Sequence, residues 1–95
     1  MTVLGVATLQ HFAKLHAASR KPLTRFIEIV RAAEWRHLPE VKRTFPAVDY
    51  AAATGTMIFD IGGNKYRLIA RVDFKEQILF IQDVWTHEQY DREDL

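Results

Sequence analysis

Cysteine is absent from this chain of 95 residues, which excludes disulfide bonds and thiolate metal sites and permits a reducing compartment. Long apolar runs are absent too. No stretch approaches the roughly 20 residues that a membrane-spanning helix needs, and the N-terminus lacks the apolar segment of a signal peptide. We therefore expect a cytoplasmic protein with no membrane partner.

The chain also lacks a large excess of charge of either sign, because 13 Lys and Arg nearly balance 12 Asp and Glu. The resulting net charge of +1 neither requires nor excludes nucleic acid, since the placement of charge matters more than its sum. The apolar fraction of 48% suits a folded chain, and the length leaves no room for two cores. We expect residues 1–95 to form a single domain.

Residues 56–91 organise the chain. Three apolar-rich runs, 56–61, 66–74 and 78–85, are separated by two short polar or glycine-containing breaks. This pattern predicts a three-stranded antiparallel meander. Gly62 and Gly63 supply the positive φ values that a tight turn needs in the first break.

Alternation assigns two faces to the middle strand. The apolar face, which suits a core, holds Tyr66, Leu68, Ala70, Val72 and Phe74. The opposite face holds Lys65, Arg67, Ile69, Arg71 and Asp73. Successive residues of one face lie about 7 Å apart, so the three cations form a row that matches a phosphate backbone. The alternative is an ordinary solvated face of an antiparallel sheet.

The upstream half reads as a helical layer on this sheet, which predicts an α+β fold. Residues 8–18 and 19–34 each show a helical stripe, with Ser19 as the expected cap of the second helix. The stripes are Leu9, Phe12, Ala13 and His16, then Leu23, Phe26, Ile27 and Val30. Residues 2–6 suggest a short edge strand, Pro39–Thr44 a single helical turn, and residues 50–55 an exposed loop.

The segment from Thr86 to Asp91 is the second candidate for chemistry. If it is helical, Thr86 caps it, and His87, Tyr90 and Asp91 share one face. Histidine is the usual proton-transfer residue near neutral pH, and tyrosine donates to an anion or stacks on a base. The alternative is a surface histidine with Tyr90 packed back on the sheet.

Metal sites are disfavoured. Asp60, Asp73 and Asp83 are spread over three strands, which argues against a metal nuclease. His11 and His16 are five residues apart and do not share a helix face well. We expect no metal and no cofactor.

Several segments together resemble one known family. They are Ile58–Ile69 (IFDIGGNKYRLI), Val84–Asp91 (VWTHEQYD), Lys21–Leu23, Ala33–Trp35 and Val41–Phe45. In this order and spacing they are similar to the HigB-type toxins of bacterial type II toxin–antitoxin systems, within the RelE superfamily. The resemblance covers nearly the whole chain.

The resemblance implies a RelE-like fold, with two N-terminal helices packed on a curved, mainly antiparallel sheet of three to four strands. It implies an mRNA interferase, a metal-independent endoribonuclease that cuts mRNA on the ribosome and inhibits translation. It also implies a HigA-type antitoxin with a helix-turn-helix domain. Carried over by position, the family's marked residues are Asn64, Lys65, Arg67, His87, Tyr90 and Asp91.

The mechanism we expect uses the RNA 2′-OH as nucleophile, so that the protein only aligns groups, moves protons and stabilises charge. Lys65 and Arg67 stabilise the transition state, His87 transfers protons, and Tyr90 positions the phosphate or stacks a base. Arg71 and Arg43 hold flanking backbone or ribosomal RNA. Two alternatives stay open: a non-catalytic module that binds RNA or an acidic partner, and a degenerate toxin that only binds its antitoxin.

Overall fold

The computed structural model describes the backbone of residues 1–92 and the side chains of residues 1–90. Its centre is a five-stranded sheet with the strand order β1-β5-β4-β3-β2. β1 pairs with β5 in parallel, and the other neighbours are antiparallel. The strands are β1 (Thr2–Leu4), β2 (Asp49–Ala51), β3 (Thr56–Ile61), β4 (Tyr66–Asp73) and β5 (Ile78–Thr86).

The predicted meander is confirmed as β3, β4 and β5, and the predicted edge strand as β1. The expectation of three to four strands was wrong, because Asp49–Ala51 adds a fifth, β2, to the free edge of β3. The exposed loop predicted at 50–55 therefore shrinks to the turn between β2 and β3. Tyr50 is 47% exposed, so β2 carries little of the alternation that reveals a strand.

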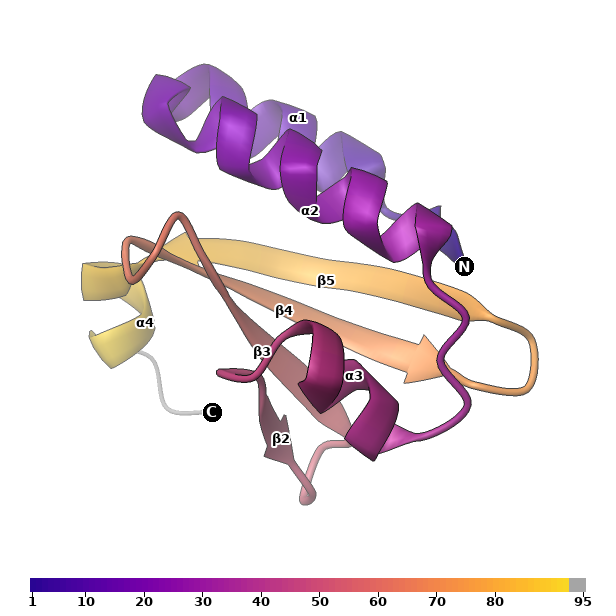
Figure 1. Ribbon diagram of the computed structural model, residues 1–95. Helices are drawn as coiled ribbons and strands as arrows, with labels where there is room; N and C mark the ends of the chain where they lie inside the picture. Colours follow the sequence, from indigo (N-terminus) through magenta and orange to yellow (C-terminus); the bar gives the residue numbers. More distant parts are fainter. Residues whose placement is uncertain (93–95) are drawn as a thin grey trace.

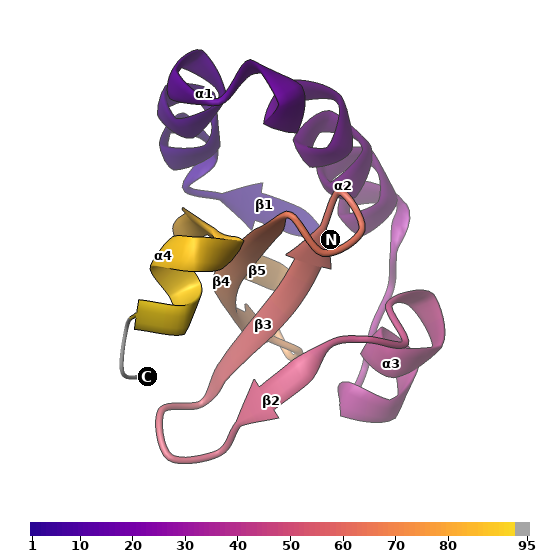
Figure 2. The same cartoon turned by 90° about the vertical axis from the view of Figure 1, so that its left-hand side faces the viewer.

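Four α-helices accompany the sheet within the described residues: α1 (Val6–Leu15), α2 (Arg20–Ala32), α3 (Leu38–Thr44) and α4 (His87–Arg92). Figures 1 and 2 show α1 and α2 side by side over one face of the sheet, with α4 at the end of β5. Buried side chains of α1 and α2 join those of the strands in one core, which includes Leu9, Phe12, Phe26, Phe59, Leu68 and Leu79. None of the described helices has the length and apolar character needed to span a bilayer.

The link between α1 and α2 differs from the prediction. α1 ends at Leu15, and a 3-10 turn, Ala17–Ser19, leads into α2. Ser19 occupies the N-cap position of α2, as predicted, but its hydroxyl donates to the carbonyl of His16 at 2.7 Å and makes no capping hydrogen bond to the helix. His16 thus lies just beyond the helix, in a turn held by the buried Ser19.

A β-bulge shapes the end of β5. Ile69 pairs with Asp83 but Ala70 pairs with Ile81, so β5 carries one extra residue at this point. The extra residue lets Ile81 and Val84 both enter the core, although strict alternation would place them on opposite faces. A bulge also bends the strand and increases its local twist, so it changes the direction in which the chain leaves β5 and enters α4.

Two glycines provide a matched test of this geometry. Gly5 before α1 has φ +90°, and a Cβ there would lie 2.6 Å from the carbonyl oxygen of Ile81. Gly63 has φ +74° with nothing within 4 Å of such a Cβ. Gly63→Ala is expected to lower the free energy of unfolding by about 1–2 kcal/mol through backbone strain alone. Gly5→Ala is expected to cost about 1–3 kcal/mol more, from overpacking. Urea denaturation of both variants measures the difference, and equal losses would contradict the close approach of Gly5 to β5.

Candidate functional site

Arg67 stands at the centre of a polar cluster on the sheet face opposite α1 and α2. Its Nε lies 3.2 Å from Oδ1 of Asp60, which faces it across the β3–β4 hairpin. Its Nη2 donates to Oδ1 of Asn64 at 2.6 Å, and its Nη1 lies 3.3 Å from the carbonyl oxygens of Asn64 and Tyr66. The side chain is only 12% exposed, so these contacts fix the guanidinium in place.

The short helix α4 completes the cluster. His87 Nδ1 lies 3.2 Å from Nη2 of Arg67, and the Tyr90 ring centroid lies 5.5 Å from the Arg67 Cζ, a cation–π distance. Arginine can only donate, so Nδ1 of His87 is the acceptor in this contact. We call Arg67, Asp60, Asn64, His87 and Tyr90 the Arg67 cluster.

Local sequence explains why α4 begins where it does. The Gln89 backbone N–H donates to the Thr86 hydroxyl at 3.2 Å, and the Thr86 N–H donates to Oε1 of Gln89 at 2.9 Å. This reciprocal pair is a capping box, and it confirms Thr86 as the predicted cap. The His87 N–H donates to the Lys65 carbonyl at 2.8 Å, which ties α4 to the hairpin that carries Asn64 and Arg67.

The other predicted site residues lie outside this cluster. Lys65 lies in the exposed turn just before β4, next to Asn64. Arg71 is exposed on β4, close to Gly55 in the β2–β3 turn. Arg43 belongs to α3, which lies across the molecule from α4 in both views (Figures 1 and 2). The side chain of Asp91 lies outside the described residues.

The prediction that Lys65, Arg67 and Arg71 form a row of cations on the open face of the sheet is therefore confirmed only in part. Arg71 lies on β4 and Lys65 just before it, and both are exposed, but Arg67 between them is mostly buried by its partners. The reason is the four-residue turn, 62–65, whose register places Asp60 directly opposite Arg67. A carboxylate and a guanidinium at such a cross-strand pair attract each other.

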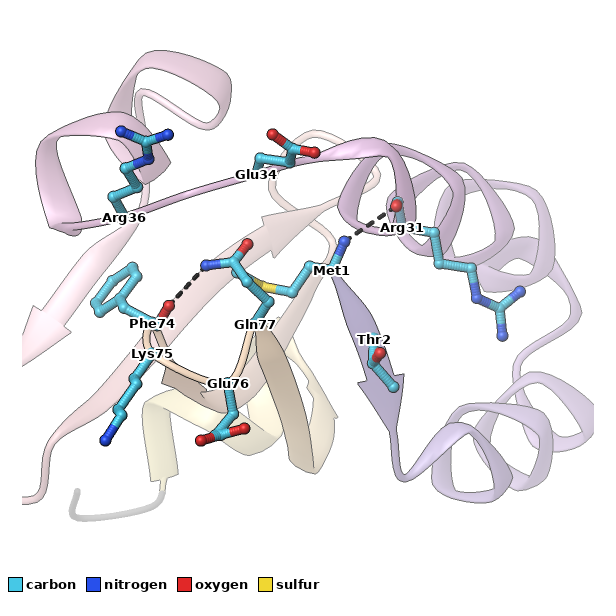
Figure 3. Close-up of a pocket in the computed structure, with 9 residues that line it drawn as sticks. All are labelled: Met1, Thr2, Arg31, Glu34, Arg36, Phe74, Lys75, Glu76 and Gln77. Carbon is cyan, nitrogen blue, oxygen red and sulfur yellow. Dashed lines mark hydrogen bonds between the residues drawn. The ribbon is translucent and has the colours of Figure 1, made fainter.

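Comparing the linings of two surface hollows shows which of them is the better candidate site. A hollow of about 520 Å³ borders the cluster and includes Asn64, Lys65 and His87 in its lining. A larger hollow of about 650 Å³ lies at the other end of β4 and β5, around the turn that holds Gln77 (Figure 3). There Arg31, Arg36 and Lys75 point in different directions instead of converging, and no predicted site residue lines it.

The acidic residues do not form a metal site in the part of the chain that the structure describes. No group of three or more His, Asp or Glu there lies close enough to hold a metal ion. Asp60 is engaged by Arg67, and Asp83 accepts from the backbone N–H of Val84 at 2.8 Å.

Comparison with known proteins identifies the family. A family model described as the HigB toxin, the RelE-like toxic component of a toxin–antitoxin system, matches residues 19–93. The chain belongs to the HigB toxin family. It is 36% identical over 92 residues to the mRNA interferase toxin HigB of Escherichia coli K12, covering 96% of this chain and 88% of the relative. It is also similar to the mRNA interferase HigB of Escherichia coli O6:H1, with 22% identity over 97% of this chain and 90% of the relative.

Sequence reasoning missed two residues of this HigB-family toxin that the structure places at the site. Asp60 was considered only as a metal ligand, although counting back from the Gly62–Gly63 turn would have placed it opposite Arg67. His16 was assigned to the apolar stripe of the first helix, yet it lines the hollow beside the Arg67 cluster. No local sequence pattern predicts that His16 lies there, because its position depends on how the helical layer packs on the sheet.

Proposed function

We propose that this HigB-family toxin is an mRNA interferase, an endoribonuclease that cuts mRNA on the ribosome and so inhibits translation. Relatives that match nearly its whole length carry that name. The observation that carries the proposal is the Arg67 cluster. It fixes a guanidinium among an imidazole, a phenol ring and an amide, and Lys65 lines the hollow that borders the cluster. These are the groups that hold phosphate, move protons and contact bases.

The reaction follows from RNA itself. The 2′-OH attacks the adjacent phosphorus, the O2′–P bond forms, and the P–O5′ bond breaks. A base takes the proton from the 2′-OH and an acid gives one to O5′, leaving a 2′,3′-cyclic phosphate and a 5′-OH. His87 transfers protons, while Lys65 and Arg67 stabilise the charge of the transition state. Tyr90 positions the phosphate or stacks a base. The scheme uses no metal and no cofactor.

Arg67 makes room for phosphate by giving up its weakest contacts. Its two bonds to backbone carbonyls are 3.3 Å long, whereas its contact with Asn64 is 2.6 Å. A phosphate oxygen offers a charged acceptor in their place, and charge-assisted hydrogen bonds are roughly twice as strong as neutral ones. Asp60 and Asn64 meanwhile keep the guanidinium oriented.

In addition to the groups given catalytic roles above, four residues are proposed to bind RNA. Asn64 and Asp91 contact the RNA next to the cut. Arg71 follows the strand along β4, and Arg43 on α3 holds flanking or ribosomal RNA. We further propose that residues 1–95 form one RelE-like toxin domain that acts in the cytoplasm. Its partner is a HigA-type antitoxin with a helix-turn-helix domain.

A second candidate function has one observation in its favour. Every nitrogen of the Arg67 guanidinium already has a partner within the protein, as expected of a residue that only supports a binding surface. In that case the protein is a non-catalytic module for RNA or its antitoxin, and Arg71 matters more than His87. Induced in cells, a module of this kind leaves translated messages intact. The interferase cuts them, with the termini given above.

Asp60 is predicted to be a positioning residue. Asp60→Asn keeps the size of the side chain but removes the charge that holds Nε of Arg67, so the guanidinium loses part of its orientation. We expect mRNA cleavage to slow about 10- to 100-fold, the scale of a misplaced catalytic group. The rate is measured by primer extension in a translation extract. Asp49→Asn, at an exposed position on β2, is the matched control and keeps the wild-type rate. An unchanged rate for Asp60→Asn would contradict this role.

A further inference from the structure

The hollow of about 520 Å³ beside the Arg67 cluster has the make-up of a small ligand site. Its lining is His16, Asn64, Lys65, Tyr66, Thr86, His87 and Glu88. Its volume falls within the range of about 300–1,000 Å³ that is typical of such sites. Asn64 and His87 belong both to the lining and to the Arg67 cluster, so a ligand in the hollow lies directly next to the proposed reaction centre.

His16 forms a fixed ring at the edge of this hollow. Its imidazole stacks on Phe12 with centroids 4.3 Å apart and an angle of 28° between the planes. Phe12 in turn meets Tyr66 edge to face at 5.6 Å, and both of these rings are buried. The carbonyl of His16 accepts from the backbone N–H of Ser19 at 2.9 Å and from its hydroxyl at 2.7 Å. The ring therefore needs little reordering when a ligand binds.

Lys65 lines one part of the hollow and can hold a phosphate, whereas the other polar groups near His16 suit a nucleobase. The exposed carboxylate of Glu88 repels phosphate but accepts hydrogen bonds from exocyclic amino groups. Oδ1 of Asn64 is taken by Arg67, which leaves its NH₂ group as a donor. Unstacked RNA bases commonly stack on aromatic or histidine rings and use their edges for hydrogen bonds.

From these observations we propose that the hollow is a subsite for one nucleobase of the RNA next to the cut bond. His16 is its stacking wall, and Glu88 selects bases that carry an exocyclic amino group. The inference rests on the proposed endoribonuclease function. In it, Arg67 and Lys65 hold the scissile phosphate while the neighbouring base enters the hollow. Uracil lacks an exocyclic amino group and is the base that Glu88 disfavours.

The test uses the full chain in a translation extract with messages that differ in one nucleotide at each position flanking the cut. Rates come from primer extension. The wild type is expected to cut messages with A, C or G at one flanking position faster than the message with U there. His16→Ala is expected to slow cleavage of the favoured messages about 5- to 150-fold, the range for loss of one base stack. His16→Phe keeps a stacking ring and is expected to restore most of that rate.

Two further variants sharpen the test. Glu88→Gln, on the exposed rim, is expected to narrow the difference between the favoured bases and U while the protein stays folded. His11→Ala changes the same residue type on α1 outside this hollow and is expected to keep the wild-type rate and preference. If His16→Ala does not fold, Glu88→Gln and His16→Phe decide the question.

The outcomes separate the two proposals. If the wild type cuts messages but shows no base preference beside the cut, the subsite is refuted and the endoribonuclease stands. The same holds if Glu88→Gln keeps the wild-type preference, or if a folded His16→Ala keeps the wild-type rate. If the wild type cuts no message, the proposed function fails and the subsite falls with it.

Discussion

Arg67→Ala is expected to reduce mRNA cleavage about 10²- to 10³-fold, the effect of removing one preorganised donor from a developing charge. The guanidinium contacts Asp60 on β3, the backbone of β4 at Tyr66 and two side chains of α4. Its loss removes the proposed phosphate contact and the group that orients His87. Single-turnover cleavage in a translation extract measures the effect.

Arg67→Lys separates charge from shape in the same assay. Lysine keeps the positive charge but cannot reproduce the planar fork that contacts Asp60, Asn64 and His87 at once. We expect it to recover less than a tenth of the lost activity. Arg25→Ala removes an exposed cation from α2 and is the control that should cleave like the wild type. Thermal unfolding shows whether each variant is folded, and a folded Arg67→Ala with wild-type activity would refute the central role of Arg67.

A single 2′-deoxy substitution at the nucleotide 5′ of the cut phosphate is expected to abolish cleavage. In the proposed reaction the 2′-oxygen forms the new bond to phosphorus, so its removal leaves no nucleophile for the groups of the Arg67 cluster to activate. The same substitution one nucleotide further upstream is the control and should leave the rate close to that of unmodified RNA. Products are identified by their ends, a 2′,3′-cyclic phosphate and a 5′-OH. Undiminished cutting of the deoxy substrate would show that water is the nucleophile instead.

The sequence was most informative where a pattern repeats. The meander is visible because β3, β4 and β5 are apolar-rich runs of strand length, separated by Gly62, Gly63 and the polar break at 75–77. The start of α4 is visible because Thr86 and Gln89 have the spacing of a capping box. Such signals depend on neighbours in the chain, so they can be read without the fold.

The remaining features depend on contacts between distant parts of the chain. β2 is three residues long and largely exposed, so its sequence shows no alternation of apolar and polar residues. It forms because its backbone can pair with the free edge of β3. The bulge in β5 changes which residues enter the core, and alternation alone misses it. His16 reaches the hollow only because α1 packs across β5 and ends beside the β3–β4 turn.

Induction of the wild type beside His87→Ala, with growth and the integrity of translated messages followed together, tests the central claim most directly. The wild type is expected to arrest growth and cut messages, while soluble His87→Ala is expected to do neither. Growth arrest and cut messages with a folded His87→Ala would contradict the proposed site. Intact messages with the wild type would contradict the activity itself.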